Sequence, residues 1–193
     1  MTTELKPSPD ATRLERTYDA RAEVIWELWT TAAGLEKWLV PDGFETRVTD
    51  IELRPGGQLR YTMTATGPEQ VAFVKNLGLP LTSEFRRTLT EVAARRRLAW
   101  LSLIGFVPGQ EPFEHLTVID IEPCGESTTV VVTLDPLHDE TWTREYRAHR
   151  ANELDKLDAV VRARHSASDT EPTPPTTSAS CRWFGETRAA GVE

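Results

Sequence analysis

Apolar and polar residues alternate with a period of two in most of the chain between residues 11 and 135, which predicts β-strands. Turn signals such as Pro55-Gly56-Gly57 separate neighbouring strands. Hairpin turns between successive strands are typical of an antiparallel meander. The expected strands cover residues 11–18, 44–54, 58–66, 82–92, 97–106, 113–122 and 127–135.

The period changes to helical spacing after the first strand and again after the last. Asp19 is expected to cap a helix, and a short second helix is expected over residues 34–39. Residues 67–81 interrupt the strands, and a short helix there would bury its apolar side against the sheet edge or over a cavity mouth. A long helix is expected from about 139 to 164. Its mostly apolar stripe must be buried, and the concave face of the sheet is the expected partner. This stripe contains Trp142, Tyr146, Arg150, Leu154, Leu157 and Val161.

These elements predict an α+β helix-grip domain, in which a curved antiparallel sheet of about seven strands wraps around a long C-terminal helix. Two short helices follow the first strand. The domain is expected to cover residues 11–165 and to follow a loose N-terminus of ten residues. Residues 166–193 are rich in Pro, Ser and Thr, so we expect a disordered tail there.

Charge and composition restrict the partners. The net charge of −8 disfavours nucleic acids, since phosphate binding needs an excess of Lys and Arg. No apolar run approaches the roughly 20 residues that span a bilayer, and we expect neither membrane insertion nor a signal peptide. Cys124 and Cys181 lack the spacing of a zinc or redox pair. The sequence therefore predicts a cytoplasmic protein without a metal or other cofactor.

Five motifs occur in the order found in the START-like (SRPBCC, Bet v 1-like) superfamily. They are RTYDARAEVIWELWTT (16–31), LEKWLVP (35–41), DIELRPGGQLRY (50–61), TEVAARRRLAW (90–100) and ELDKL (153–157). The sequence most resembles the branch named after the activator of the 90-kDa heat-shock chaperone's ATPase. The resemblance covers roughly residues 12–162.

The resemblance implies the helix-grip fold and a cavity between sheet and long helix that often holds an apolar or aromatic ligand. It does not imply a reaction, because most members bind molecules and a minority cyclise or dehydrate polyketides. One departure concerns the middle of the last helix. The family usually has Gly-Trp there, and this chain has His149-Arg150.

Arg150 lies on the same helical face as Tyr146 and Leu154. A buried guanidinium needs a partner, so three outcomes are open. It pairs with an acidic strand residue (Glu84, Glu91 or Asp120), it reaches solvent, or it faces the cavity and binds an acidic ligand. The residues for which we expect cavity lining are Tyr61, Met63, Trp100, His138, Trp142, Tyr146 and Arg150.

Other polar groups favour structural roles. His138, Asp139 and Glu140 are interpreted as the start of the long helix, where carboxylates favour the helix dipole. His115 alternates with apolar neighbours and is interpreted as a structural histidine with satisfied hydrogen bonds, rather than a catalytic one. For Trp26 and Trp29 we favour core packing over cavity lining.

Three functions stay open at this point. The first is a non-catalytic binder of a small apolar or aromatic molecule. The second is a polyketide cyclase or aromatase, in which Arg150, His149 or His138 polarises a carbonyl and Tyr61 donates a proton. The third, implied by the branch name, is a chaperone partner. The sequence does not fix the oligomeric state, and a homodimer stays among the alternatives.

Overall fold

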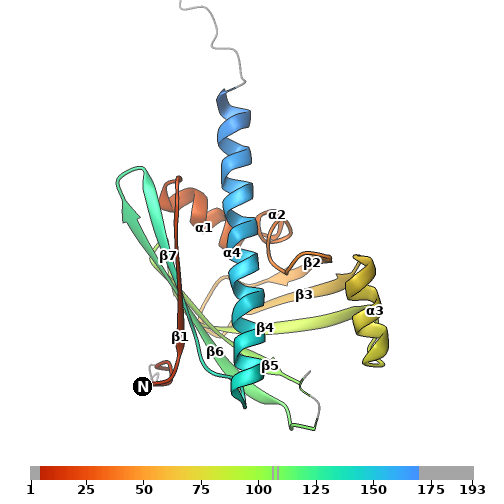
Figure 1. Ribbon diagram of the computed structural model, residues 1–193. Coiled ribbons are helices and arrows are strands. Elements are labelled where there is room, and N and C mark those ends of the chain that lie inside the picture. Colours follow the sequence, from red (N-terminus) through yellow and green to blue (C-terminus); the bar gives the residue numbers. More distant parts are fainter. Residues whose placement is uncertain (1–4, 106, 108, 170–193) are drawn as a thin grey trace, which may run out of the picture.

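The computed structural model describes residues 5–105, 107 and 109–169, and its centre is one curved antiparallel sheet (Figure 1). The strand order is β1-β7-β6-β5-β4-β3-β2. The seven strands are β1 (Thr12–Tyr18), β2 (Phe44–Ile51), β3 (Gln58–Ala65), β4 (Thr82–Ala93), β5 (Arg97–Ile104), β6 (Phe113–Cys124) and β7 (Ser127–Leu134). Each lies within two or three residues of its predicted bounds, so the period-two alternation located the whole sheet.

Four helices complete the described chain: α1 (Ala22–Thr30), α2 (Ala32–Leu35), α3 (Pro68–Asn76) and α4 (Glu140–Asp169). α4 lies across the sheet as the long C-terminal helix of a helix-grip fold, which confirms the predicted class (Figure 1). None of the helices in the described ranges has the length and apolar composition needed to cross a membrane.

Some predicted helix ends were wrong. The N-cap of α1 is Arg21 in an extended conformation, and Asp19 does not cap the helix. The backbone just before Arg21 is bound to β7 instead: the Thr128 hydroxyl of that strand donates to the Ala20 carbonyl at 2.7 Å. α2 begins earlier than expected because the Thr31 side chain accepts from the Gly34 N–H.

α4 continues to Asp169, five residues past the predicted end at 164 and into the predicted tail. The rest of the predicted tail, residues 170–193, lies outside the described residues, as does Cys181.

The expected burial of α3 is also wrong for most of its apolar residues. Val74 is the buried residue of this helix, whereas Phe73 is 57% exposed and Leu77, which follows the helix, is 44% exposed. A helix of nine residues beside one strand presents only one narrow face to the sheet, and neighbouring side chains point away from that face.

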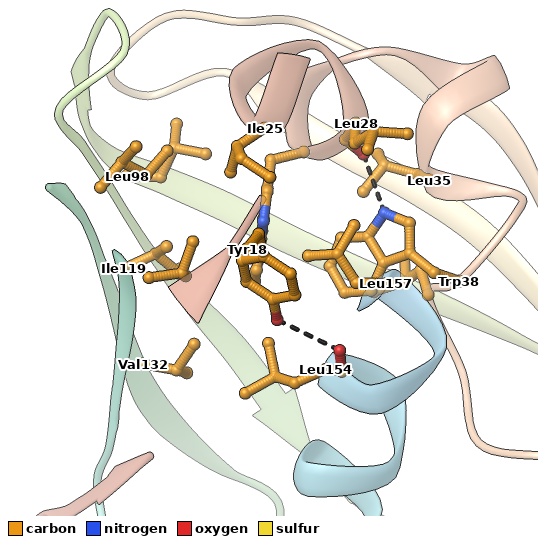
Figure 2. Packing of buried hydrophobic residues seen from close by; sticks show 14 of the residues in the cluster. Tyr18, Ile25, Leu28, Leu35, Trp38, Leu98, Ile119, Val132, Leu154 and Leu157 are labelled. Atoms are coloured by element: carbon orange, nitrogen blue, oxygen red, sulfur yellow. Dashed lines mark hydrogen bonds between the residues drawn. The ribbon is translucent and has the colours of Figure 1, made fainter. Parts of the chain in front are cut away.

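The main core lies between the inner face of the sheet, the face toward α4, and the helices α1, α2 and α4. Two buried polar atoms fix this packing (Figure 2). The Tyr18 hydroxyl donates to the Leu154 carbonyl of α4 at 3.1 Å, and Trp38 Nε1 donates to the Leu28 carbonyl of α1 at 3.0 Å. The predicted stripe of α4 is therefore buried through Leu154, Leu157 and Val161.

The α1–α2 corner depends on Gly34. A Cβ at this position would lie 2.7 Å from Leu28 Cα, a backbone atom that cannot move away cheaply. We expect Gly34→Ala to lower the free energy of unfolding by about 1–3 kcal/mol, measured by urea denaturation. Gly105→Ala is the matched control, because its Cβ would meet only Pro112 side-chain atoms at 3.5 Å or more. Equal stability of the two variants would show that the corner relaxes freely.

Candidate functional site

Alternation along the strands places a group of polar and aromatic side chains on the inner face, opposite the first half of α4. Arg87 of β4 pairs in register with Ser102 of β5, and Ser102 pairs with His115 of β6. We call this group and its neighbours the inner polar cluster. Its members are Tyr61, Arg87, Trp100, Ser102, His115, Thr117, Tyr146, Arg150 and Glu153.

Arg87 is the most unusual member, because it is only 2% exposed. Its Nη2 donates to the Tyr61 hydroxyl at 3.0 Å, and its guanidinium lies over the rings of Tyr61 and Trp100, at 5.0 and 4.7 Å from their centroids. Its Nη1 is buried without a hydrogen-bond partner among the described residues, and no carboxylate of those residues forms an ion pair with it. Arg87 is thus a buried cation held by aromatic faces and one hydroxyl.

Arg150, by contrast, is compensated within its own helix. Its guanidinium forms an ion pair with Glu153 and donates to the Tyr146 hydroxyl at 2.8 Å. Burial alone would lower the pKa of Arg150, but Glu153 and the neighbouring tyrosines outweigh burial and raise it. Arg150 therefore stays charged and paired.

The predicted strand partners for Arg150 were wrong. Glu91 and Asp120 both bind Arg97, at 2.9 and 2.5 Å, and Glu84 is exposed. The true partner, Glu153, is one helical turn further along α4, where residues three apart are neighbours on the surface.

His115 is buried and neutral. Burial is the largest influence on it and lowers the pKa of its imidazole. Nε2 lies 2.7 Å from the Asp135 carbonyl, which can only accept, so Nε2 carries the proton. Nδ1 is then an acceptor, and it has no partner among the described residues. The structure buries His115, but the expectation that its hydrogen bonds are satisfied was wrong, since Nδ1 leaves one free acceptor in the cluster.

Acid should destabilise the protein through His115. Because the folded-state pKa lies below that of the unfolded chain, the unfolded state binds more protons, and stability is lost as the pH falls below about 6.5. We expect the wild type to lose more unfolding free energy between about pH 7.5 and about pH 5.5 than His115→Gln, which does not titrate there. Urea denaturation at both pH values measures this, and identical losses would contradict the assignment of His115 as neutral.

Further polar atoms of the cluster also lack partners. Trp100 Nε1, Ser102 Oγ, Thr117 Oγ1 and Arg150 Nε are buried without a hydrogen bond among the described residues. Natural interiors pair nearly all such atoms, so several in one place call for an explanation. A binding site that donates to a ligand is one such explanation.

The other predicted cavity residues lie around this cluster. Met63 is partly buried against the main core. Trp142 packs on a separate apolar group formed by Ile104, Val107 and Leu137, and Tyr146 of the cluster contacts both this group and the main core. These placements leave the lining role of the seven predicted residues a prediction.

His138 lies at the start of α4, with Nε2 2.8 Å from Asp139. Asp139 accepts from the Trp142 N–H at 2.8 Å, which confirms the interpretation of this segment as a helix start. His149 is exposed. Of the three groups that the cyclase alternative offered to polarise a carbonyl, Arg150 is the one whose charge acts on Tyr61. Within the described ranges, no three His, Cys, Asp or Glu side chains are grouped closely enough to hold a metal ion.

A hollow of about 760 Å³ lies at β3 and β4, where residues of both sheet faces border it and Tyr61 is its one residue from the inner polar cluster. From the inner face, its wall includes Tyr61 and Phe85, whose rings stack with centroids 5.4 Å apart, together with Ser83. From the outer face, it includes the charged residues Arg60, Glu84 and Arg86. Volumes of roughly 300–1,000 Å³ are typical of small-molecule sites. Tyr61 belongs both to this wall and to the contacts of Arg87, and it is the one predicted cavity residue in the wall.

Sequence reasoning missed Arg87, Ser102 and Glu153. A signal for Arg87 was present, because it stands between Phe85 and Leu89 at a period of two and so shares their face. A charged residue on an apolar strand face is the feature that would have identified it.

A curved antiparallel sheet closed by a long C-terminal helix defines the START-like class of helix-grip proteins. The sequence model of one family in this class, described as "Activator of Hsp90 ATPase homolog 1-like protein", matches residues 19–162. The chain belongs to this family.

Solved structures agree with the fold. Protein CV1439 from Chromobacterium violaceum has 20% sequence identity and a TM-score of 0.64, over 80% of this chain and 98% of its own. Ms6760 from Mycobacterium smegmatis has 19% identity and a TM-score of 0.63, over 84% and 99%. The AHSA1 protein from Silicibacter pomeroyi has 18% identity and a TM-score of 0.61, over 80% and 99%. A search of curated proteins found no match.

Proposed function

We propose that this protein binds a small apolar or aromatic molecule, which enters the hollow beside Tyr61 and Phe85 and extends toward the inner polar cluster. The observation that carries the proposal is the group of buried polar atoms of the cluster without partners among the described residues: Arg87 Nη1, Trp100 Nε1, Ser102 Oγ, His115 Nδ1, Thr117 Oγ1 and Arg150 Nε. Each such atom costs about 1–3 kcal/mol when it is left unpaired, and a ligand that pairs some of them recovers part of that cost.

The surroundings of these atoms suit a flat molecule. Phe85 borders the hollow and is only partly buried, so its ring is the aromatic surface that a ligand ring can pack against, whereas Arg87 covers the rings of Tyr61 and Trp100. A reaction is not needed to account for any of these features, so we propose binding alone.

A neutral probe tests this proposal. N-phenyl-1-naphthylamine should bind the full chain saturably with one site per chain, and its fluorescence should rise in the apolar site. Ser83→Trp should block the site, because Ser83 lines the hollow. Thr82→Trp is the matched control, since Thr82 is exposed and precedes Ser83 on the same strand. Absence of saturable binding to the wild type, or equal binding to both variants, would contradict the proposal.

A further inference from the structure

We infer that the ligand carries a carboxylate that binds Arg87, so that the protein is a receptor for aromatic acids. This inference rests on the proposed function and names the chemical class of the ligand. It also moves the anion-binding role from Arg150, where the helical stripe suggested it, to a strand residue.

Charge is the first argument. The groups around Tyr61 include two guanidiniums, Arg87 and Arg150, and one carboxylate, Glu153. Since Glu153 is bound to Arg150, one positive charge in this region is without a counter-ion among the described residues. Burying an unpaired cation is costly, and a bound anion removes most of that cost.

Hydrogen bonding is the second argument. Arg87 Nη1, Trp100 Nε1 and Arg150 Nε can only donate, and none of them has an acceptor among the described residues. The Tyr61 hydroxyl already accepts from Arg87, so its own proton is free to donate. Burial raises the pKa of Tyr61, which keeps that proton in place. An excess of donors suits a carboxylate, which offers about four acceptor positions and matches the guanidinium fork.

Access is the third argument. Arg87 Nη1 is buried, but Tyr61, which accepts a hydrogen bond from Arg87, also borders the hollow. Phe85, stacked on Tyr61, is only partly buried. A shift of this ring pair would expose Arg87 to a molecule in the hollow. The ring of the acid would then occupy the hollow while its carboxylate reaches Arg87.

The test compares acids with neutral amides of the same shape. Benzoate, 2-naphthoate and anthracene-9-carboxylate, each with its amide, are titrated into the full chain by calorimetry or tryptophan fluorescence. The wild type should bind at least one acid about tenfold or more tightly than its amide, because a charge-assisted hydrogen bond is lost in the amide. Arg87→Met should abolish this preference. Arg97→Met, which removes a cation paired elsewhere on the sheet, should retain it.

The wild-type ratio needs no variant, so the inference stays testable even where Arg87→Met folds poorly. Equal binding of acids and amides would overturn the inference, while saturable binding of the neutral dye would still support the proposed function. Failure of every acid to bind would also overturn the inference. If the neutral dye does not bind either, both the inference and the proposed function are overturned. If the preference for acids over amides survives in Arg87→Met but is lost in the double variant Arg150→Met/Glu153→Leu, the carboxylate binds Arg150 and the inference for Arg87 is wrong.

Discussion

Glu153→Leu should lower the free energy of unfolding by roughly 3–5 kcal/mol, because it leaves the Arg150 guanidinium buried without its counter-ion. The side chains of Glu153 and Arg150 are only 7% and 13% exposed, so water cannot replace the lost carboxylate easily. Leucine keeps most of the volume, which separates the electrostatic effect from a cavity. Urea denaturation monitored by circular dichroism measures the change.

Two controls show whether the effect comes from the pair. The double variant Arg150→Met/Glu153→Leu should recover most of the loss, since an apolar pair often replaces a buried ion pair without cost. Asp158→Leu breaks the ion pair with Arg162 on the same helix, where the Arg162 side chain is 78% exposed, and should cost no more than about 1 kcal/mol. If Glu153→Leu costs as little as Asp158→Leu, the buried pair contributes no more than a surface pair does.

Leu157→Ala should destabilise the protein by roughly 2–5 kcal/mol, as is typical when a fully buried leucine is truncated. Leu157 is 0% exposed and lies in the main core where α4 meets the sheet (Figure 2). The loss combines less apolar burial with a cavity that the surrounding α1, α2 and sheet residues cannot fill completely.

Leu53→Ala is the matched control for this change. Leu53 is 40% exposed between β2 and β3, so the same truncation should alter the free energy of unfolding by about 0.5 kcal/mol or less. The two leucines are compared by the midpoint and slope of urea denaturation. A neutral Leu157→Ala would mean that the buried stripe of α4 does not anchor the helix.

The sheet and the α4 stripe were predictable because each depends on one repeating pattern. Alternation at period two marks every strand, and spacings of three and four mark the face of α4 that carries Leu154, Leu157 and Val161. Both patterns persist over many residues, so single exceptions do not hide them.

The site was less predictable because it depends on register and on pairs of residues. A shift in the β4–β5 pairing between Leu89 and Glu91 decides which residues of the two strands face α4 together. Such a shift leaves no mark in the sequence of one strand. The Arg150–Glu153 pair, however, is local, and helical spacing alone could have suggested it.

The order of the strands also has a consequence for how the chain folds. β2 to β7 pair with their neighbours in sequence, but β1 pairs with β7, so that Thr12 lies beside Leu134. Closing such a long loop costs chain entropy before any contact forms, which favours late docking of β1. We expect Leu14→Ala in β1 mainly to speed unfolding and hardly to slow folding in stopped-flow experiments. A mainly slower folding rate would instead place β1 in the folding nucleus.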